Sequence, residues 1–235
     1  MPAASPVADS PLIVALDTAD AAQASGWATS LMPHAGLFKL GLEFFLAHGA
    51  AGVRGVTGTP VFLDLKLHDI PNTVAGGVRA VLPLRPRMLT IHAAGGSAMI
   101  QAAAQAAQAA GSARPLILAV TVLTSLDQAA LHAIGVDASP AEQVLRLARL
   151  AVAAGADGLV CSPHEAAVLR QALGGDVTLV VPGIRPAGAA AGDQARTMTP
   201  REAMQAGADW IVVGRPITAA PDPAAAAAAI VASLR

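Results

Sequence analysis

A polar segment, Asp64-Leu-Lys-Leu-His-Asp69, follows an apolar run in this 235-residue chain. Asp64 and Lys66 are two residues apart, so both side chains would point to the same side of a β-strand. Asp69 follows three residues after Lys66, and Lys39 lies in an earlier apolar run, residues 37–40. Two ammonium groups and two carboxylates could form an alternating row in which each buried charge has a partner. A purely structural ion-pair network is the alternative, but four charges gathered in a charge-poor chain favour a chemical use.

Two further segments combine glycine with arginine. Val-Pro-Gly-Ile-Arg185-Pro and Gly214-Arg215-Pro-Ile-Thr each follow a β-branched run. Glycine lets backbone N–H groups approach an anion, and arginine adds charge-assisted hydrogen bonds. One such loop is weak evidence, whereas two in neighbouring units indicate a phosphorylated small ligand.

Short apolar runs alternate along the chain with longer, alanine-rich segments of helical character. The predicted strands are residues 12–16, 37–40, 61–65, 88–91, 116–120, 158–160, 178–181 and 211–213. The predicted helices are residues 21–31, 43–49, 73–84, 97–110, 141–154, 165–173, 200–206 and 223–234. Pro after Ser or Thr marks helix starts at 140 and 200, and glycines at 49, 111, 155 and 207 are expected to end helices.

Eight strand–helix units in about 220 residues fit a closed (β/α)8 TIM barrel better than an open doubly wound sheet. Strands that are apolar almost throughout suit a parallel sheet covered on both faces. No linker divides the chain, so a single α/β barrel domain is predicted over residues 11–235, after a disordered tail of residues 1–10. The Gly/Ala-rich stretch 186–196 is expected to be a functional lid or a disordered loop.

Each predicted strand runs into polar residues. In strand order these include Asp17, Lys39, Asp64 with Lys66, His92, Thr124, Cys161-Ser162, Arg185 and Gly214-Arg215. The carboxyl ends of all strands in a (β/α)8 barrel surround one mouth, where such folds carry their active sites. The sequence therefore predicts one polar site at this mouth.

The composition narrows the classes of partner. The chain is 54% apolar and 13% charged, with a formal net charge of −1, so a nucleic-acid-binding surface is not expected. A single cysteine, Cys161, excludes an intramolecular disulfide and a cysteine-rich zinc site, and we interpret it as a buried apolar residue. A reducing, cytoplasmic location is expected. No apolar stretch approaches the roughly 20 residues that span a bilayer, and no secretory signal, nucleotide P-loop or nucleophile elbow is found.

The segment Asp64-Leu-Lys-Leu-His-Asp69-Ile-Pro-Asn-Thr73 resembles the signature of the bacterial orotidine 5′-phosphate decarboxylase family. Further segments resemble that family in the same order, from residue 12 to about residue 218. They are Leu-Ile-Val-Ala-Leu-Asp17, Phe-Lys39-Leu-Gly, Val-Thr-Val-Leu-Thr124-Ser, Val-Pro-Gly-Ile-Arg185-Pro, Gly-Asp-Gln194 and Val-Val-Gly214-Arg215-Pro. The resemblance implies a (β/α)8 barrel that works as a homodimer with shared active sites. It also implies conversion of orotidine 5′-phosphate to uridine 5′-phosphate and CO2, the last step of de novo UMP biosynthesis, without metal or organic cofactor.

The resemblance further assigns roles to the charged row. Asp17 and Lys39 would hold the ribose hydroxyls, and Lys39 would also complete the row. Asp64 would face the substrate carboxylate, and Lys66 would stabilise a C6 carbanion and deliver a proton to it.

Other residues would bind the substrate or complete a second site. Asp69 and Thr73 would reach the site of the neighbouring subunit, and Thr124 would bind the pyrimidine edge. The phosphate and the lid would be handled by Arg185, Gln194, Gly214 and Arg215.

Two other interpretations remain open. A magnesium-dependent keto-sugar-phosphate decarboxylase or aldolase on the same barrel resembles this chain in its Asp-x-Lys-x-x-Asp core. The continuation Ile70-Pro-Asn-Thr73 and the Gly-Asp-Gln194 segment favour the pyrimidine enzyme. The third interpretation is a non-catalytic nucleotide-binding or purely structural barrel, against which the complete charged row argues.

Overall fold

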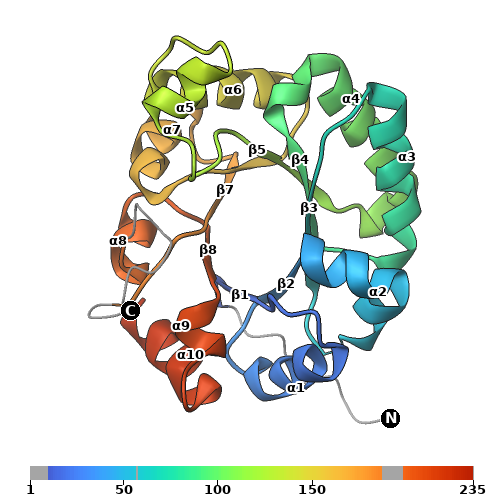
Figure 1. Ribbon diagram of the computed structural model, residues 1–235, viewed down its shortest axis with the longest axis vertical. Coiled ribbons are helices and arrows are strands. Elements are labelled where there is room, and N and C mark those ends of the chain that lie inside the picture. Colours follow the sequence, from blue (N-terminus) through green and yellow to red (C-terminus); the bar gives the residue numbers. More distant parts are fainter. Residues whose placement is uncertain (1–9, 57, 187–197, 235) are drawn as a thin grey trace.

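Eight parallel strands, hydrogen-bonded in chain order, close into a barrel inside a ring of helices (Figure 1). The computed structural model describes residues 10–56, 58–186 and 198–234. The predicted (β/α)8 barrel is confirmed. Most of the predicted tail and of the 186–196 stretch lies outside the described residues. Ser10, which the prediction placed in the tail, is buried, and its hydroxyl accepts a hydrogen bond from the Leu12 N–H.

The elements follow one another as strand and helix around the ring. The strands are β1 (Leu12–Ala15), β2 (Leu37–Gly41), β3 (Val61–Leu67), β4 (Met88–His92), β5 (Leu116–Val120), β6 (Gly158–Val160), β7 (Thr178–Val181) and β8 (Trp210–Val213). The α-helices are α1 (Ala21–Leu31), α2 (Leu42–Gly55), α3 (Pro71–Val81), α4 (Gly96–Ala107), α5 (Gln128–Ala133), α6 (Pro140–Ala153), α7 (Ala166–Leu173), α8 (Pro200–Gln205), α9 (Arg215–Thr218) and α10 (Pro223–Ser233). Short 3₁₀ turns cover Leu82–Leu84, Ala93–Gly95, Gln108–Ala113 and Pro163–Glu165.

The helices depart from the prediction at four places. Gly111 was expected to end a helix, but α4 already ends at Ala107, and 3₁₀ structure continues through Gly111 to Ala113. Gly49 was expected to end a helix, and it does take a positive φ of 56°, but helical structure resumes after it and α2 continues to Gly55. The short helix α5 was not predicted; it begins where the Asp127 carboxylate accepts a hydrogen bond from the Ala130 N–H. The four-residue helix α9 was interpreted as loop. None of the described helices is long and apolar enough to cross a membrane.

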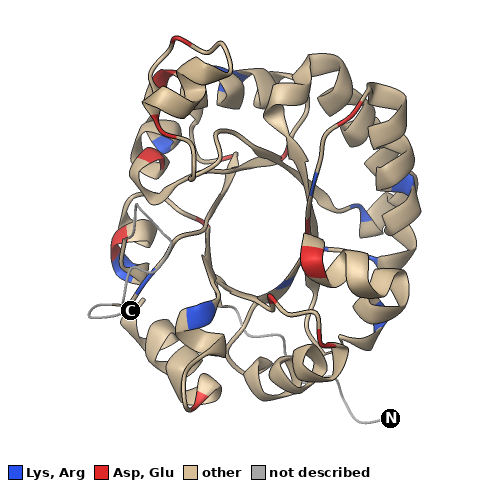
Figure 2. Ribbon diagram, viewed as in Figure 1, with Lys and Arg blue, Asp and Glu red and all other residues tan. Residues whose placement is uncertain are grey.

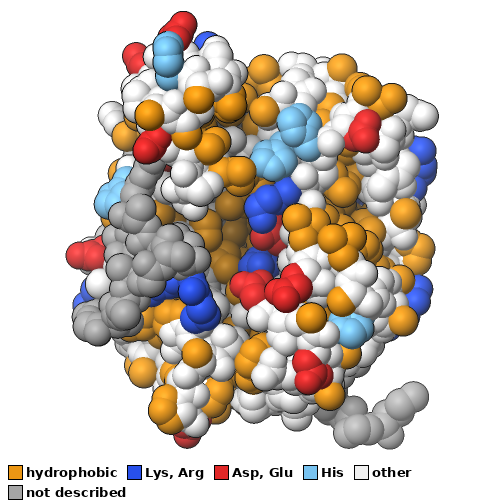
Figure 3. Space-filling view, viewed as in Figure 1, with side chains coloured by type: hydrophobic (Ala, Val, Ile, Leu, Met, Phe, Trp, Pro, Cys, Tyr) orange, Lys and Arg blue, Asp and Glu red, His pale blue; other side chains and the backbone are white. Residues whose placement is uncertain are grey.

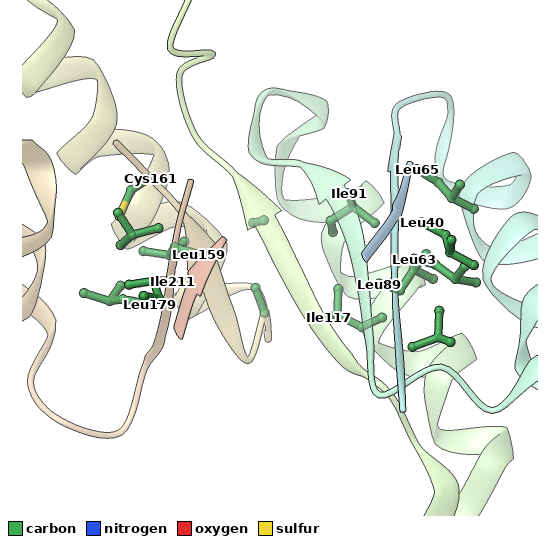
Figure 4. Close-up of a cluster of buried hydrophobic side chains, with 14 of the residues drawn as sticks. Leu40, Leu63, Leu65, Leu89, Ile91, Ile117, Leu159, Cys161, Leu179 and Ile211 are labelled. Atoms are coloured by element: carbon green, nitrogen blue, oxygen red, sulfur yellow. The ribbon is translucent and has the colours of Figure 1, made fainter. Parts of the chain in front are cut away.

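Alternation along the strands sorts the apolar side chains into two cores. Inside the barrel, one cluster fills the interior on the side of the strands' amino ends. It consists of Ile13, Ala15, Leu37, Phe62, Met88, Leu118, Val180 and Val212. The residues between them point outward and pack under the helices, as the labelled side chains of Figure 4 show on both sides of the ring. Each fully buried Leu, Ile or Phe contributes about 1.5–3 kcal/mol. The inner cluster also closes the barrel at the amino ends of its strands, so the opening at their carboxyl ends leads into a cavity and not into a channel.

Two aspartates hold the amino ends of the later strands. Asp209 directly precedes β8, and its carboxylate accepts hydrogen bonds from the Leu179 N–H of β7 at 2.7 Å and from Arg170 at 2.6 Å. Asp157 directly precedes β6 and does the same for the Ile117 N–H at 2.8 Å. Arg170 also donates to the backbone carbonyls of three residues, Gly174, Val177 and Gly207. These clamps lie at the end of the barrel opposite the strand carboxyl ends, where (β/α)8 folds keep stability rather than chemistry.

The clamp at β8 generates a stability prediction. Asp209→Ala should lower the free energy of unfolding by about 1–2 kcal/mol, because it leaves the Leu179 N–H without its acceptor. Chemical denaturation measures this loss, with Asp176→Ala as a control, since Asp176 is an exposed aspartate three residues before Leu179. Equal unfolding free energies for the two variants would show that the hydrogen bonds of Asp209 do not stabilise the fold.

Candidate active site

A cavity of about 260 Å³ opens at the carboxyl ends of the strands. Figure 3 shows it as a hollow in the middle of this face, with apolar walls and with basic and acidic side chains gathered along one side. Its floor is apolar and includes Ala15, Phe62, Val120, Val160 and Val212. A cavity with an apolar floor and a few polar groups on its walls is the usual form of a small-molecule site.

Four charged side chains from β1 to β3 form an alternating row along this cavity. Lys39 Nζ lies 2.9 Å from Asp17 Oδ1 and 3.7 Å from Asp64 Oδ2. Lys66 Nζ lies 2.8 Å from the same Asp64 oxygen. Figure 2 shows acidic and basic positions side by side on this part of the ring. These side chains lie close together because successive side chains of a strand point to opposite faces, and the inward-facing positions of neighbouring parallel strands stand next to one another.

Strand β3 is irregular where it carries Asp64 and Lys66. Its pairing with β4 shifts register between Leu63 and Leu67, where β3 advances four residues against two of β4, and we call this irregular stretch the bulge. Within the bulge Lys66 takes a φ of +48°, in the left-handed region that non-glycine residues rarely adopt. Such a conformation costs on the order of 1–3 kcal/mol and persists where the surroundings impose it, often at functional sites. The sequence contains no glycine or proline here that could have signalled the bulge.

Thr90 of β4 is a member of the site that sequence reasoning missed. Its hydroxyl lies 2.9 Å from Asp64 Oδ1, to which it donates, and it accepts a hydrogen bond from the Lys66 N–H, also at 2.9 Å. Thr90 is completely buried. A hydroxyl in the middle of the run Met-Leu-Thr-Ile, at an inward position of the strand, was the available signal.

The electrostatics of the row keep Asp64 ionised. Burial of the Asp64 carboxyl, whose side chain is 14% exposed, acts to raise its pKa. The positive charges of Lys39 and Lys66 and the hydrogen bonds from Lys66 and Thr90 outweigh that effect, so the pKa lies below its ordinary value of 3.8. Asp64 is therefore a carboxylate over the whole physiological range of pH.

A histidine pair lies beside the row. The rings of His68 and His92 are 5.3 Å apart. Burial, followed by the nearby His68 and Lys66, lowers the pKa of His92. His92 is thus held in its neutral form and adds no positive charge next to Lys66.

The rest of the cavity wall comes from β5 to β8. Thr124, Arg185, Gly214 and Arg215 all line it, as the sequence predicted. Gly183 lines it too, with a φ of +78° that explains why glycine stands in this loop. The cavity therefore has ammonium and carboxylate groups on the β1–β3 side and guanidinium groups on the β7–β8 side.

Three predicted site residues are not part of this cavity as the structure describes it. Asp69 is exposed, and its carboxylate accepts a hydrogen bond from the adjacent Ile70 N–H at 2.6 Å. Thr73 is exposed in the first turn of α3. Gln194 lies outside the described residues. The second carboxylate of the row is therefore Asp17, at the Lys39 end, and not Asp69, which was expected beyond Lys66.

Cys161 contributes to the cavity wall but has no feature of a reactive thiol. Its side chain is buried in the outer apolar core, as predicted, and Figure 4 shows it among that cluster. Burial raises the pKa of the Cys161 thiol, so it stays protonated.

The structure is a closed (β/α)8 barrel with a partly charged cavity at the carboxyl ends of its strands, the place where enzymes of this fold carry their active sites. The sequence model of the "Orotidine 5'-phosphate decarboxylase / HUMPS family" matches residues 10–230. The chain belongs to this family.

Individual relatives cover nearly the whole chain. An orotidine 5′-phosphate decarboxylase of Gluconobacter oxydans is 60% identical, covering 95% of this chain and 96% of the relative. One from Thermobifida fusca is 57% identical, covering 96% of each. The crystal structure of the Lactobacillus acidophilus orotidine 5′-phosphate decarboxylase matches with a TM-score of 0.86 and 42% identity, over 97% of this chain and 100% of that one.

The low pKa of Asp64 generates a prediction on acid stability. A carboxyl with a lower pKa in the folded than in the unfolded state stabilises the fold above the unfolded pKa, and this contribution is lost as the pH falls. The free energy of unfolding of the wild type should therefore drop more steeply between about pH 5 and pH 3 than that of Asp64→Asn. Denaturant titrations at both pH values measure the two slopes. The other carboxylates are common to both proteins, so parallel slopes would show that Asp64 is not stabilised as an anion.

Proposed function

We propose that this protein decarboxylates orotidine 5′-phosphate to uridine 5′-phosphate and CO2, the last step of de novo UMP biosynthesis. The observation that carries the proposal is the position of Lys66 Nζ, at the cavity wall and 2.8 Å from a buried Asp64 carboxylate. Family membership and relatives of 57–60% identity with that name support it.

The reaction needs a fixed cation. When the bond between C6 and the carboxylate carbon breaks, CO2 leaves and the electron pair stays on C6, in the plane of the ring, where conjugation cannot spread it. Preorganised positive charge can stabilise such an anion in a cavity that excludes water. Lys66 supplies this charge and then donates a proton from Nζ to C6, acting as a general acid. Its neutral amine regains a proton from water before the next turnover.

The carboxylates of the row hold the cation in place. Asp64 bonds Lys66 directly and, as a buried anion, faces the carboxylate group that leaves. Lys39 and Asp17 are bonded to each other at 2.9 Å at the more open end of the row, where they would bind the ribose hydroxyls. Catalysis in this proposal is electrostatic and positional, without metal or organic cofactor.

The far wall would bind the rest of the nucleotide. Arg185, Gly214 and Arg215, with Gln194, would bind the phosphate, and Thr124 would bind the pyrimidine edge. Binding energy from a phosphate remote from C6 can lower the barrier of the chemical step by helping to organise the charged groups.

A homodimer with shared active sites follows from the same proposal. Asp69 and Thr73 stand exposed next to Ile70, an apolar side chain that is 67% exposed at the start of α3. Such a surface suits contact with a second copy of the chain, whose cavity Asp69 and Thr73 would complete. The cytoplasm stays the predicted location.

A magnesium-dependent reaction on keto-sugar phosphates is the second candidate. It would use the same Asp-x-Lys-x-x-Asp core, with carboxylates as metal ligands. The two oxygens of Asp64 bond Lys66 and Thr90, which favours an ammonium-centred site. Loss of orotidine 5′-phosphate absorbance at an equal rate with and without EDTA supports the proposal. No loss, or loss abolished by EDTA, contradicts it.

Lys66→Ala tests the role of the central cation. It should lower kcat by at least about 10³-fold, because the variant loses both the electrostatic donor and the proton donor. The fold and the affinity for uridine 5′-phosphate should stay largely intact, as judged by circular dichroism and calorimetry. The control Arg149→Ala removes one exposed positive charge from α6 and should leave kcat unchanged. A Lys66→Ala enzyme with near-wild-type turnover would refute the assignment.

Mixed dimers test the sharing of active sites. Asp17→Ala and Asp69→Ala should each be almost inactive alone. Unfolding and refolding them together should restore up to about a quarter of wild-type activity, because half of the dimers are mixed and each has one intact site. A mixture as inactive as its parents would show that Asp17 and Asp69 serve the same chain.

A further inference from the structure

Thr90 faces the bulge that carries Asp64 and Lys66. From Leu63 to Leu67 strand β3 advances four residues, whereas from Leu89 to Ile91 strand β4 advances two. Thr90 is the residue between Leu89 and Ile91, so it stands opposite the extra length of β3. In the pairing described for β3 and β4, no residue between Leu63 and Leu67 has a register partner.

The Thr90 hydroxyl replaces a missing ladder bond. The Lys66 N–H, in its left-handed conformation, donates to Thr90 Oγ1 at 2.9 Å instead of to a backbone carbonyl of β4. A buried N–H without an acceptor is costly, so this bond helps to hold the bulge. Thr90 is suited to the task, because its β-branched side chain is restricted at χ1 and it is fully buried.

The same hydroxyl also orients the Asp64 carboxylate. It donates its proton to Asp64 Oδ1, while Lys66 Nζ donates to Asp64 Oδ2 at 2.8 Å. A hydroxyl has one proton and two lone pairs, so it can accept at one residue and donate at the other at the same time. One side chain therefore holds both ends of Lys66: the backbone directly, and the ammonium group through Asp64.

We propose that Thr90 is a positioning residue of the decarboxylase site, which fixes the Lys66 ammonium group against the reacting carbon. This inference rests on the proposed function. Thr90 does not line the cavity and would not touch the substrate. Its loss should therefore lower kcat and leave KM nearly unchanged, since the described groups proposed to bind phosphate, Arg185, Gly214 and Arg215, follow β7 and β8.

The test compares Thr90→Val, which keeps the shape and removes the hydroxyl, with Thr90→Ser, which keeps the hydroxyl. Thr90→Val should lower kcat by about 10- to 100-fold, the scale on which misplacing a catalytic group by 1 Å acts. Thr90→Ser should restore kcat to within about threefold of wild type, because both hydrogen bonds can form. Thr90→Ala gives the same comparison if the valine variant does not fold.

The matched control is Thr121→Val. Thr121 is also a buried threonine, beyond the end of β5, and its hydroxyl donates to the Val160 carbonyl at 3.3 Å, away from the charged row. Its kcat should equal that of the wild type. A Thr90→Val kcat no lower than that of Thr121→Val, or a Thr90→Ser enzyme as slow as Thr90→Val, would overturn the positioning role.

Crystal structures of the two Thr90 variants separate this inference from the proposed function. In Thr90→Val the contact between Lys66 Nζ and Asp64 should lengthen or break, and in Thr90→Ser it should persist. An unchanged contact in Thr90→Val would overturn the inference even if the wild type is an active decarboxylase. A wild type without decarboxylase activity would instead overturn the proposed function, and the two structures would still decide whether Thr90 positions Lys66.

Discussion

The buried Asp64 carboxylate, shared by two ammonium groups, is the interaction on which the site depends. An isolated buried anion would be strongly unfavourable, and two adjacent lysines would repel each other without it. Each charge is therefore tolerable because the others are present. The result is a lysine, Lys66, that is held in one place and stays next to a fixed anion. Such an arrangement suits a reaction whose difficulty is a localised negative charge, because the stabilising cation is in position before that charge develops.

The polar residues at the two ends of the barrel have different roles: those at the amino ends of the strands stabilise the fold, and those at the carboxyl ends form the site. At the amino ends of the strands, the carboxylates of Asp157 and Asp209 accept hydrogen bonds from backbone N–H groups and from arginines. At the carboxyl ends, the corresponding polar groups face a cavity and one another. The bulge in β3 is the point where regular pairing gives way to the geometry of the site. The left-handed conformation of Lys66 is destabilising in isolation, and the hydrogen bonds of its neighbours hold it.

Much of the fold and part of the site could be predicted from the sequence, because both follow from the alternation of inward- and outward-facing side chains along the strands. Strand periodicity and the convergence of strand ends were enough to place Asp17 and Lys39 at one mouth and to group Lys39 with Asp64 and Lys66, but they did not predict that Asp17 would complete the row in place of Asp69. The bulge and the hydrogen bonds of Thr90 could not be predicted, because they depend on the register between β3 and β4, which a single sequence does not encode locally. The continuation of α2 past Gly49 was missed for a related reason: a glycine permits a positive φ, but packing decides whether the helix resumes. The placement of Asp69 in a partner's cavity depends on a second chain and stays a prediction.

The most direct measurement of the central claim is the affinity for a uridine 5′-phosphate analogue with an anionic oxygen at C6. This group places negative charge where the reaction would develop it, and a preorganised cation should recognise it as it recognises the transition state. The account predicts that calorimetry or inhibition kinetics will find the analogue bound at least about 10²-fold more tightly than uridine 5′-phosphate. It also predicts that Lys66→Ala abolishes this preference. Equal affinities in the wild type, or a preference that survives the loss of Lys66, would contradict it.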